Sequence, residues 1–258
     1  MSRAERFLSG LGTHATIERD AFVPGAYVLS IGGAEQSHVD LAHPEHIFYA
    51  YLRRMATVLD LVRPPQEPLR VLHLGAGALT LARYVEVMRP GSRQFAVELE
   101  RELLGFVLEH LPLPEGTHLE TRIGDARWEL PGLQPEAPFD AVVLDIFSGP
   151  EAPEHLANRD FYAELRELLA PDGALLVNIG DDPPLRLVRS QLSALRTVFP
   201  EVAAVSEPEI FEARYPGNVV AVARARPWPP GWSEAIALAG PHPTEIRRGV
   251  DFDGLARR

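Results

Sequence analysis

Four short apolar stretches of the sequence are each followed by residues whose types could bind a nucleoside. A G-x-G turn lets a ligand approach the backbone beside the positive end of a following helix. A carboxylate can accept hydrogen bonds from two hydroxyl groups at once. The four positions are Gly75-Ala76-Gly77 after 71–74, Glu98 after 95–97, Gly124-Asp125 after 119–123, and Asp145 after 141–144.

Two of these acids have a specific expected partner. Glu98 lies 23 positions after Gly75, close to the spacing at which an acid binds ribose hydroxyls in dinucleotide-binding folds. Asp125 could accept a hydrogen bond from an adenine amino group. Each acid alone is explained equally well as a cap of the next helix or as a residue facing water. The coincidence of all four positions favours a ligand site.

Alternating strands and helices must position these residues. From Leu69 on, apolar stretches of strand length alternate with stretches of helical spacing. This alternation predicts an α/β fold, a Rossmann-like doubly wound and mostly parallel sheet, in which ligands bind beyond the carboxyl ends of the strands. Strands are predicted at 71–74, 94–97, 119–123, 141–144, 174–179, 202–205 and 219–223, and helices at 79–88, 101–111, 161–169 and 185–199.

Proline-rich stretches are predicted to divide the chain into three parts. Residues 1–63 form an N-terminal β-hairpin cap and a linking helix, and residues 64–225 form the Rossmann-like nucleoside-binding domain. Residues 226–258 form a C-terminal extension, which includes a short helix near 233–239.

Within the cap, local signals predict three features. Residues 1–12 are expected to be poorly ordered, and Gly32-Gly33 is expected to turn a hairpin. Pro44 is predicted to open a helix that runs to about Val62, with Tyr51 on its apolar face.

Composition excludes several classes of protein. The 258 residues carry 36 acidic and 25 Lys or Arg side chains, a net charge of −11, so a nucleic-acid partner is not expected. The absence of cysteine excludes disulfides and thiolate chemistry. No apolar stretch reaches the roughly 18 residues of a membrane span, and the N-terminus has no signal-peptide core, so no membrane partner and a cytoplasmic location are expected.

The strand-end motifs resemble those of a known family. The stretches 71–77 (VLHLGAG), 97–100 (VELE), 123–126 (IGDA) and 143–145 (VLD) are similar to successive motifs of class I S-adenosylmethionine-type transferases. Within that group the chain most resembles the spermidine synthases, the aminopropyltransferases. The resemblance covers about residues 26–223 and is more specific for the fold and the nucleoside site than for the reaction.

The resemblance implies a role for each matching residue. The turn at Gly75, Gly77 and Ala78 would face the donor, and Glu98 would hold the donor's ribose. Asp125 and its neighbour in the motif, Ala126, would hold the donor's adenine. Gln36 would reach the nucleoside from the cap. Asp145 matches the first acid of the family's D-x-x-D-P loop, which helps deprotonate the attacking amine.

The same resemblance implies the substrates and the assembly. The donor would be decarboxylated S-adenosylmethionine and the acceptor a small putrescine-like amine. A sulfonium is a good leaving group without a metal, so no metal is expected. Members of the family are commonly dimers or tetramers, which implies a homodimer.

Two departures from the family pattern open alternatives. Ala78 stands where the family has an Asp that binds the amine of the decarboxylated donor, and Ser148 replaces the second loop acid. Glu151, Glu154 or the Asp181-Asp182 pair could compensate. Alternatively, Ala78 leaves room for a carboxylate, and the protein is a methyltransferase that uses ordinary S-adenosylmethionine. A third hypothesis is a catalytically inactive binder of nucleosides or polyamines.

Other polar residues have simpler explanations. His73 lies inside a strand and is expected to be a buried, hydrogen-bonded histidine, and Asp181-Asp182 is expected to signal a helix start. His43 and His46 have no partner at a recognisable metal-ligand spacing, so no metal site is predicted. Arg214–Asn218 is expected to be a turn that borders the substrate cleft.

Overall fold

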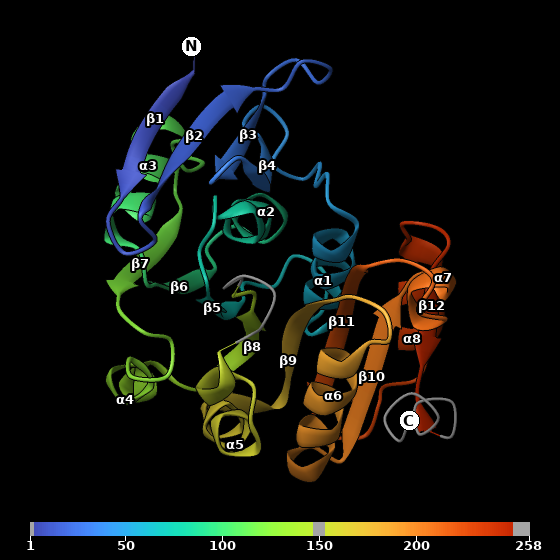
Figure 1. Ribbon diagram of the computed structural model, residues 1–258. Coiled ribbons are helices and arrows are strands. Elements are labelled where there is room, and N and C mark those ends of the chain that lie inside the picture. The colour runs from blue at the N-terminus through green and yellow to red at the C-terminus, as the bar shows by residue number, and fades with distance from the viewer. Residues whose placement is uncertain (1–2, 147–152, 250–258) are drawn as a thin grey trace.

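Two β-sheets organise the computed structural model, which describes residues 3–146 and 153–249. A four-stranded antiparallel sheet has the order β1-β2-β3-β4, and an eight-stranded sheet has the order β12-β10-β11-β9-β8-β5-β6-β7 (Figure 1). The strands of the large sheet are β5 (Arg70–Leu74), β6 (Arg93–Glu98), β7 (His118–Ile123), β8 (Phe139–Leu144), β9 (Leu169–Asp181), β10 (Glu201–Ser206), β11 (Gly217–Arg224) and β12 (Glu245–Arg247).

The large sheet is parallel from β7 to β9, and β11 runs antiparallel to its neighbours β9 and β10. The chain winds outward from β5 in both directions, because β5 pairs with β6 on one side and with β8 on the other. This topology confirms the predicted doubly wound, mostly parallel α/β sheet. It also brings the carboxyl ends of β5, β6, β7, β8 and β9 to one edge.

Helices cover both faces of this sheet because its strand residues alternate between two apolar cores. Leu72 and Leu74 pack in the core that holds α5 and α6, whereas Val71 packs in the core that holds α1 and α8. The helices are α1 (Ala50–Leu61), α2 (Thr80–Met88), α3 (Arg101–His110), α4 (Leu130–Leu133), α5 (Arg159–Leu168), α6 (Arg186–Val198), α7 (Pro208–Phe211) and α8 (Trp232–Ala239), with 3-10 turns η1 (Gln134–Glu136) and η2 (Glu154–Leu156).

The small sheet packs on α3 at one end of the large sheet (Figure 1). Its strands are β1 (Ala4–Leu8), β2 (Thr13–Arg19), β3 (Ala26–Ile31) and β4 (Ala34–Asp40). The inward-facing Leu8 and Ile17 contribute to one apolar cluster with Phe106 and Val107 of α3. Gly32 and Gly33 turn β3 into β4 at positive φ, as predicted. The division into three domains stays a prediction.

Two predictions for the N-terminal region are wrong. Residues 1–12 are not poorly ordered throughout, because β1 pairs along its whole length with β2. The helix begins at Ala50 and not at Pro44, because the Asp40 carboxylate accepts the N–H groups of Ala42 and His43 and holds that stretch in a turn. Tyr49, the residue before the helix, is extended.

In the C-terminal part, the short helix is present as α8, and β12 adds an edge strand that the sequence pattern did not indicate. Trp228 and Trp232 pack edge to face against each other, as anchors of this segment. Among the described residues, no helix is both long and apolar enough to cross a membrane.

Candidate functional site

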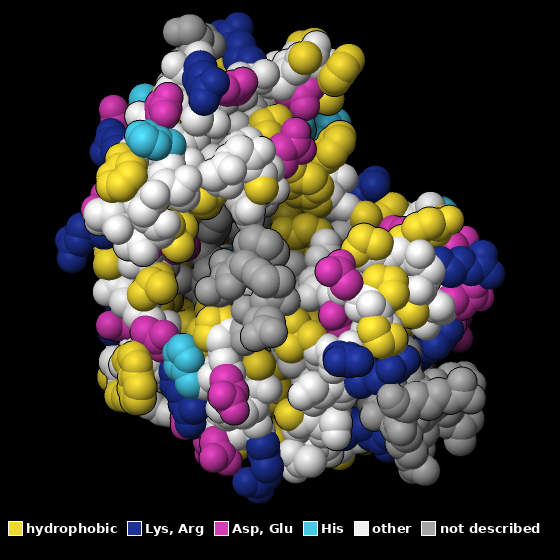
Figure 2. Space-filling model, in the orientation of Figure 1, with side chains coloured by type: hydrophobic (Ala, Val, Ile, Leu, Met, Phe, Trp, Pro, Cys, Tyr) yellow, Lys and Arg dark blue, Asp and Glu magenta, His cyan; other side chains and the backbone are white. Residues whose placement is uncertain are grey.

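A pocket of about 720 Å³ lies between the four-stranded sheet and the carboxyl edge of the large sheet. In Figure 2, hydrophobic side chains gather in the recess between these two parts of the molecule. Its walls combine β4, the start of α1 and the ends of β5, β6, β8 and β9. The pocket therefore lies where the topology of a doubly wound sheet places ligands.

The glycine turn after β5 forms part of this wall because only glycine fits there. Gly75 and Gly77 have φ angles of +89° and +49°. A Cβ on Gly75 would lie under 3.0 Å from the backbone oxygen of Asp145, and one on Gly77 would lie 3.0 Å from Ser37 Oγ. The two glycines thus bring the β5 turn against the end of β8 and against the small sheet.

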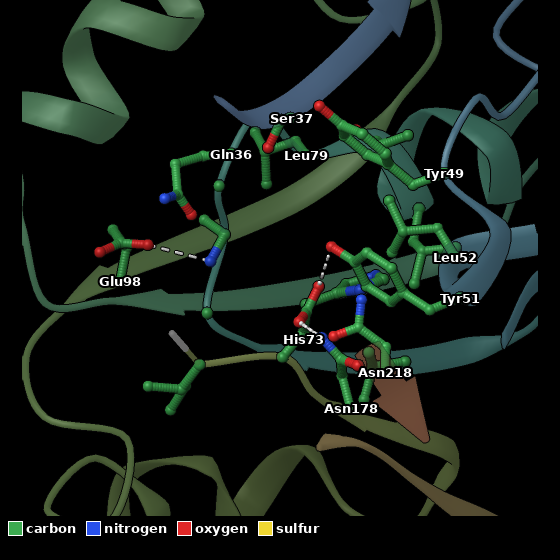
Figure 3. A pocket seen from close by; sticks show the side chains of 18 of the residues that line it. Gln36, Ser37, Tyr49, Tyr51, Leu52, His73, Leu79, Glu98, Asn178 and Asn218 are labelled. Carbon is green, nitrogen blue, oxygen red and sulfur yellow. Dashed lines mark hydrogen bonds between the residues drawn. The ribbon is translucent and has the colours of Figure 1, made fainter. Parts of the chain in front are cut away.

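Glu98, at the end of β6, reaches back to this turn. Its Oε2 accepts the N–H of Ala76 at 2.9 Å (Figure 3). Its Oε1 accepts the N–H of Glu100 at 3.0 Å. The side chain is buried but lines the pocket. Because each carboxylate oxygen has two lone pairs, Glu98 keeps the capacity to accept ligand hydroxyls.

Asp125 and Ala126 line the pocket beyond β7. The Asp125 Oδ1 accepts the N–H groups of Arg127 and Trp128, and its Oδ2 pairs with His155 Nε2 at 2.8 Å. Burial raises the pKa of Asp125, but the hydrogen bonds from His155 and from the two backbone N–H groups outweigh it and lower the pKa. Asp125 thus caps the following turn, as its simpler interpretation predicts, while it also faces the pocket.

Asp145, at the end of β8, is held by two side chains from other elements. Tyr51 Oη of α1 donates to its Oδ2 at 3.3 Å, and Asn178 Nδ2 of β9 donates to its Oδ1 at 2.8 Å (Figure 3). Burial raises the pKa of the Asp145 carboxyl, and the two hydrogen bonds only partly offset this. Burial and the nearby carboxylate raise the pKa of Tyr51 far above its usual range, so Tyr51 remains a donor.

The structure does not bring Ala78 to the pocket, although the sequence comparison placed it beside the donor. Its side chain is 1% exposed and packs in the apolar cluster between the small sheet and α3. Its N–H donates to Ser37 Oγ at 3.2 Å. The methyl group therefore leaves no free space for a ligand carboxylate.

The remaining predicted residues are placed as follows. Gln36 lines the pocket from β4, and Pro216–Asn218 border it, as expected for the turn before β11. Asp181 accepts the N–H of Val188 and so marks the start of α6, away from the pocket. Glu154 and Asp182 are not among the lining residues either. Ser148 and Glu151 lie outside the described residues.

Several pocket residues had not been predicted. Tyr51 fits the apolar face of its predicted helix, and Asn178 lies near the end of the strand predicted at 174–179. No spacing signal points to His155, whose partner Asp125 lies 30 positions earlier. Glu35 and Tyr49, which also line the pocket, form a second tyrosine–carboxylate pair. The strand-end signal finds Asp145 but not the residues that orient it.

Two histidine predictions have different outcomes. His73 is buried, bonds Gln94 through its side chain, and has a pKa lowered to about 4 by burial, as expected of a neutral core histidine. The ligand atoms of His43, Glu45 and His46 lie within 4.8 Å of one another, a juxtaposition the sequence did not predict. These three residues are not among those that line the pocket.

Charge in the pocket favours a cationic ligand. Of the basic lining residues that the structure describes, Arg54 bonds Glu207 and the carbonyls of Pro241 and Pro243, and His155 bonds Asp125. The third, His73, is neutral. The acidic lining residues are Glu35, Glu98, Glu100, Asp125, Asp145 and Glu207.

Known proteins resemble the chain at modest identity, and no family model matches it. A polyamine aminopropyltransferase of Vibrio vulnificus is 27% identical over 159 residues, 61% of this chain and 51% of that protein. One of a Synechococcus strain is 31% identical over 183 residues, 67% of this chain and 56% of that protein. The chain thus spans little more than half the length of these curated relatives.

Solved structures agree over a larger part of the chain. A probable spermidine synthase of Corynebacterium glutamicum has a TM-score of 0.89 and 26% identity, and the match covers 100% of this chain and 94% of that one. Human methyltransferase-like protein 13 with bound SAH has a TM-score of 0.58 and 21% identity, and the match covers 73% of this chain and 87% of that one. A spermidine synthase with the transition-state analogue AdoDATO has a TM-score of 0.65 and 15% identity, and the match covers 90% of this chain and 75% of that one.

The sheet topology and the glycine turn define a class I S-adenosylmethionine-type transferase fold. Within that class the chain is spermidine synthase-like, as the curated relatives and the Corynebacterium structure show. These relatives and structural neighbours are transferases by name. The sequence resemblance is therefore confirmed at the level of the fold family.

Proposed function

We propose that the chain transfers an aminopropyl group from decarboxylated S-adenosylmethionine to a polyamine acceptor. The observation that carries this proposal is the acid-lined pocket in which Tyr51 and Asn178 hold Asp145 at its floor. Both proposed substrates are cations, and a carboxylate beside the reacting amine is what the chemistry requires. The curated relatives carry the name of this activity.

The site residues divide the work between binding and proton transfer. Glu98 accepts the ribose hydroxyls, Asp125 and Ala126 contact the adenine, and Gln36 closes over the nucleoside from β4. Asp145 accepts a proton from the acceptor ammonium, which frees the nitrogen lone pair. That nitrogen forms a bond to the propyl carbon while the bond between this carbon and sulfur breaks. The electron pair of the broken bond returns to sulfur. The products are the alkylated amine and neutral methylthioadenosine.

A methyltransferase that uses ordinary S-adenosylmethionine is the alternative, and one structural neighbour contains bound SAH. The pocket gives this alternative little support. Its donor carries a carboxylate, and each basic lining residue that the structure describes is already paired or neutral. The space expected beside Ala78 is filled by apolar packing.

Turnover and binding together test the proposal. The protein incubated with decarboxylated S-adenosylmethionine and 1,4-diaminobutane is expected to release methylthioadenosine. It should also bind the decarboxylated donor more tightly than S-adenosylmethionine or SAH by calorimetry. The reverse preference would establish the methyltransferase alternative. Nucleoside binding without any product across a panel of di- and polyamines would identify an inactive binder.

A further inference from the structure

A second tyrosine–carboxylate pair lies beside the pair formed by Tyr51 and Asp145. Tyr49 Oη donates to Glu35 Oε2 at 3.4 Å, and both residues line the pocket. The rings of Tyr49 and Tyr51 stack with their centroids 6.3 Å apart and an interplanar angle of 18°. Figure 3 shows the two tyrosine side chains one above the other on the same wall.

The two pairs differ in depth. Asp145 directly follows β8 at the pocket floor, whereas Glu35 is an exposed residue near the start of β4, at the rim. Burial and the neighbouring Glu35 raise the pKa of Tyr49 to about 12, so its hydroxyl keeps its proton and orients the carboxylate. The two tyrosine–carboxylate pairs thus bring one carboxylate from each of the two sheets to the pocket.

The other four lining carboxylates that the structure describes already have charged, histidine or backbone partners. Glu98 bonds two backbone N–H groups, Asp125 bonds His155, and Glu207 bonds Arg54. Glu100 receives the backbone N–H of Gly10. Of the lining acids that the structure describes, Asp145 and Glu35 are therefore the two whose hydrogen-bond partners are uncharged side chains, so their negative charge is available to a cationic ligand.

We propose that Glu35, oriented by Tyr49, binds an ammonium group of a substrate at the rim of the pocket. This inference rests on the proposed function and adds a binding residue on the small sheet. Two substrates could supply the ammonium, because a diamine acceptor has a second one and the decarboxylated donor has one on its propyl chain. If the donor supplies it, the oriented carboxylate compensates for the absence of an acid at Ala78.

Binding measurements test the proposal without depending on turnover. Calorimetry compares wild type, Glu35→Gln, Tyr49→Phe and Glu18→Gln. Glu18 is an exposed acid on β2 outside the pocket, so its variant controls for the change in net charge. For the acceptor, 1,4-diaminobutane and 1-aminobutane are titrated into protein saturated with methylthioadenosine. For the donor, decarboxylated S-adenosylmethionine is compared with methylthioadenosine.

The expected loss is about three- to tenfold in affinity, since Glu35 is exposed but becomes partly covered by the ligand. If Glu35→Gln weakens the diamine and not the monoamine, the acceptor supplies the ammonium. If it weakens the decarboxylated donor and not methylthioadenosine, the donor supplies it. Tyr49→Phe should give a smaller loss for the same ligand.

The proposal is overturned if Glu35→Gln and Glu18→Gln bind all four compounds alike. It is also overturned if wild type prefers neither 1,4-diaminobutane to 1-aminobutane nor decarboxylated S-adenosylmethionine to methylthioadenosine. If the protein shows the Glu35-dependent preference but forms no methylthioadenosine, the proposed function is refuted and the ammonium site is still supported.

Discussion

The hydroxyl of Tyr51 donates to the carboxylate of Asp145 across 94 positions of sequence. The contact joins the second residue of α1 to the residue that follows β8. A helix that precedes the strands of the large sheet thus orients the proposed proton acceptor. Asn178, from the neighbouring strand β9, fixes the other carboxylate oxygen.

Asp145→Asn should abolish turnover while it leaves nucleoside binding intact. The amide has nearly the same shape but cannot accept a proton, so the rate should fall about 10²- to 10⁴-fold. Methylthioadenosine release and calorimetry with methylthioadenosine measure the two effects. Asp172→Asn, a change at an exposed acid near the opposite end of β9, is the matched control and should retain full activity. Equal activity of both variants would exclude Asp145 as the base.

The pH dependence of kcat/KM should show the raised pKa of Asp145. Asp145 accepts a proton only when ionised. As the pH is lowered, kcat/KM should therefore begin to fall at a higher pH than it would with an ordinary Asp, whose pKa is 3.8. The hydrogen bond from Tyr51 lowers this pKa. Tyr51→Phe should therefore move the acid limb of the profile to higher pH. A shift to lower pH, or none, would contradict the assigned hydrogen bond.

The same raised pKa predicts a stability gain at neutral pH for Asp145→Asn. A carboxyl with a higher pKa in the folded state stabilises the fold when protonated, and this contribution is lost as the pH rises through the folded-state pKa. The neutral amide avoids that loss. The variant should melt at a higher temperature than wild type at neutral pH, and the difference should vanish below pH 3.8. A variant less stable at neutral pH would show that the ionised form is favoured.

Glu98→Gln should weaken nucleoside binding before it affects the chemical step. Glutamine keeps one acceptor oxygen, so one charged hydrogen bond to a ribose hydroxyl is lost, a decrease of about tenfold or more in affinity for methylthioadenosine. Glu98→Ala should lose more, because the N–H groups of Ala76 and Glu100 then lack their partner. Calorimetry measures both, with Glu120→Gln on the exposed face of β7 as control. Unchanged affinity in Glu98→Gln would remove Glu98 from the nucleoside site.

Gly75→Ala should destabilise the protein far more than Gly33→Ala. Both glycines have positive φ, +89° and +83°, so both variants carry a backbone cost of about 1–2 kcal/mol. A methyl group on Gly33 meets no atom within 4 Å, whereas one on Gly75 collides with the Asp145 backbone. Denaturant unfolding should therefore show a larger loss of unfolding free energy for Gly75→Ala. Equal losses would mean that the turn and the β8 end are not in contact.

The positions of the acids could be predicted from the sequence, because parallel strands end at one edge of a sheet. Glu98, Asp125 and Asp145 each follow an apolar stretch, and periodicity alone locates those stretches. Periodicity cannot show which side chains meet across the sheet. Tyr51 fits an apolar helix face as well as it fits a pocket, so its contact with Asp145 needed the three-dimensional arrangement.

Side-chain hydrogen bonds to the backbone explain the errors in the N-terminal region. A proline at a helix start is a local signal, but the Asp40 carboxylate satisfies the N–H groups of Ala42 and His43 in a competing turn. The strand β1 depends on pairing with β2 and on burial of Leu8. Neither can be predicted from the sequence of such a short, polar segment. The same applies to β12, whose three residues form a strand only against β10.

The burial of Ala78 bears on how this chain can change by mutation. An acid at that position would be buried in the apolar cluster that also holds Leu8, Ile17 and Val39, and its desolvation would cost several kcal/mol. The substitution and the apolar packing between the small sheet and α3 are therefore mutually dependent. An acid at position 78 would require several neighbours to change together. The packing around Ala78 thus disfavours an acid there, so changes that adapt the substrate site are expected at the residues that line the pocket.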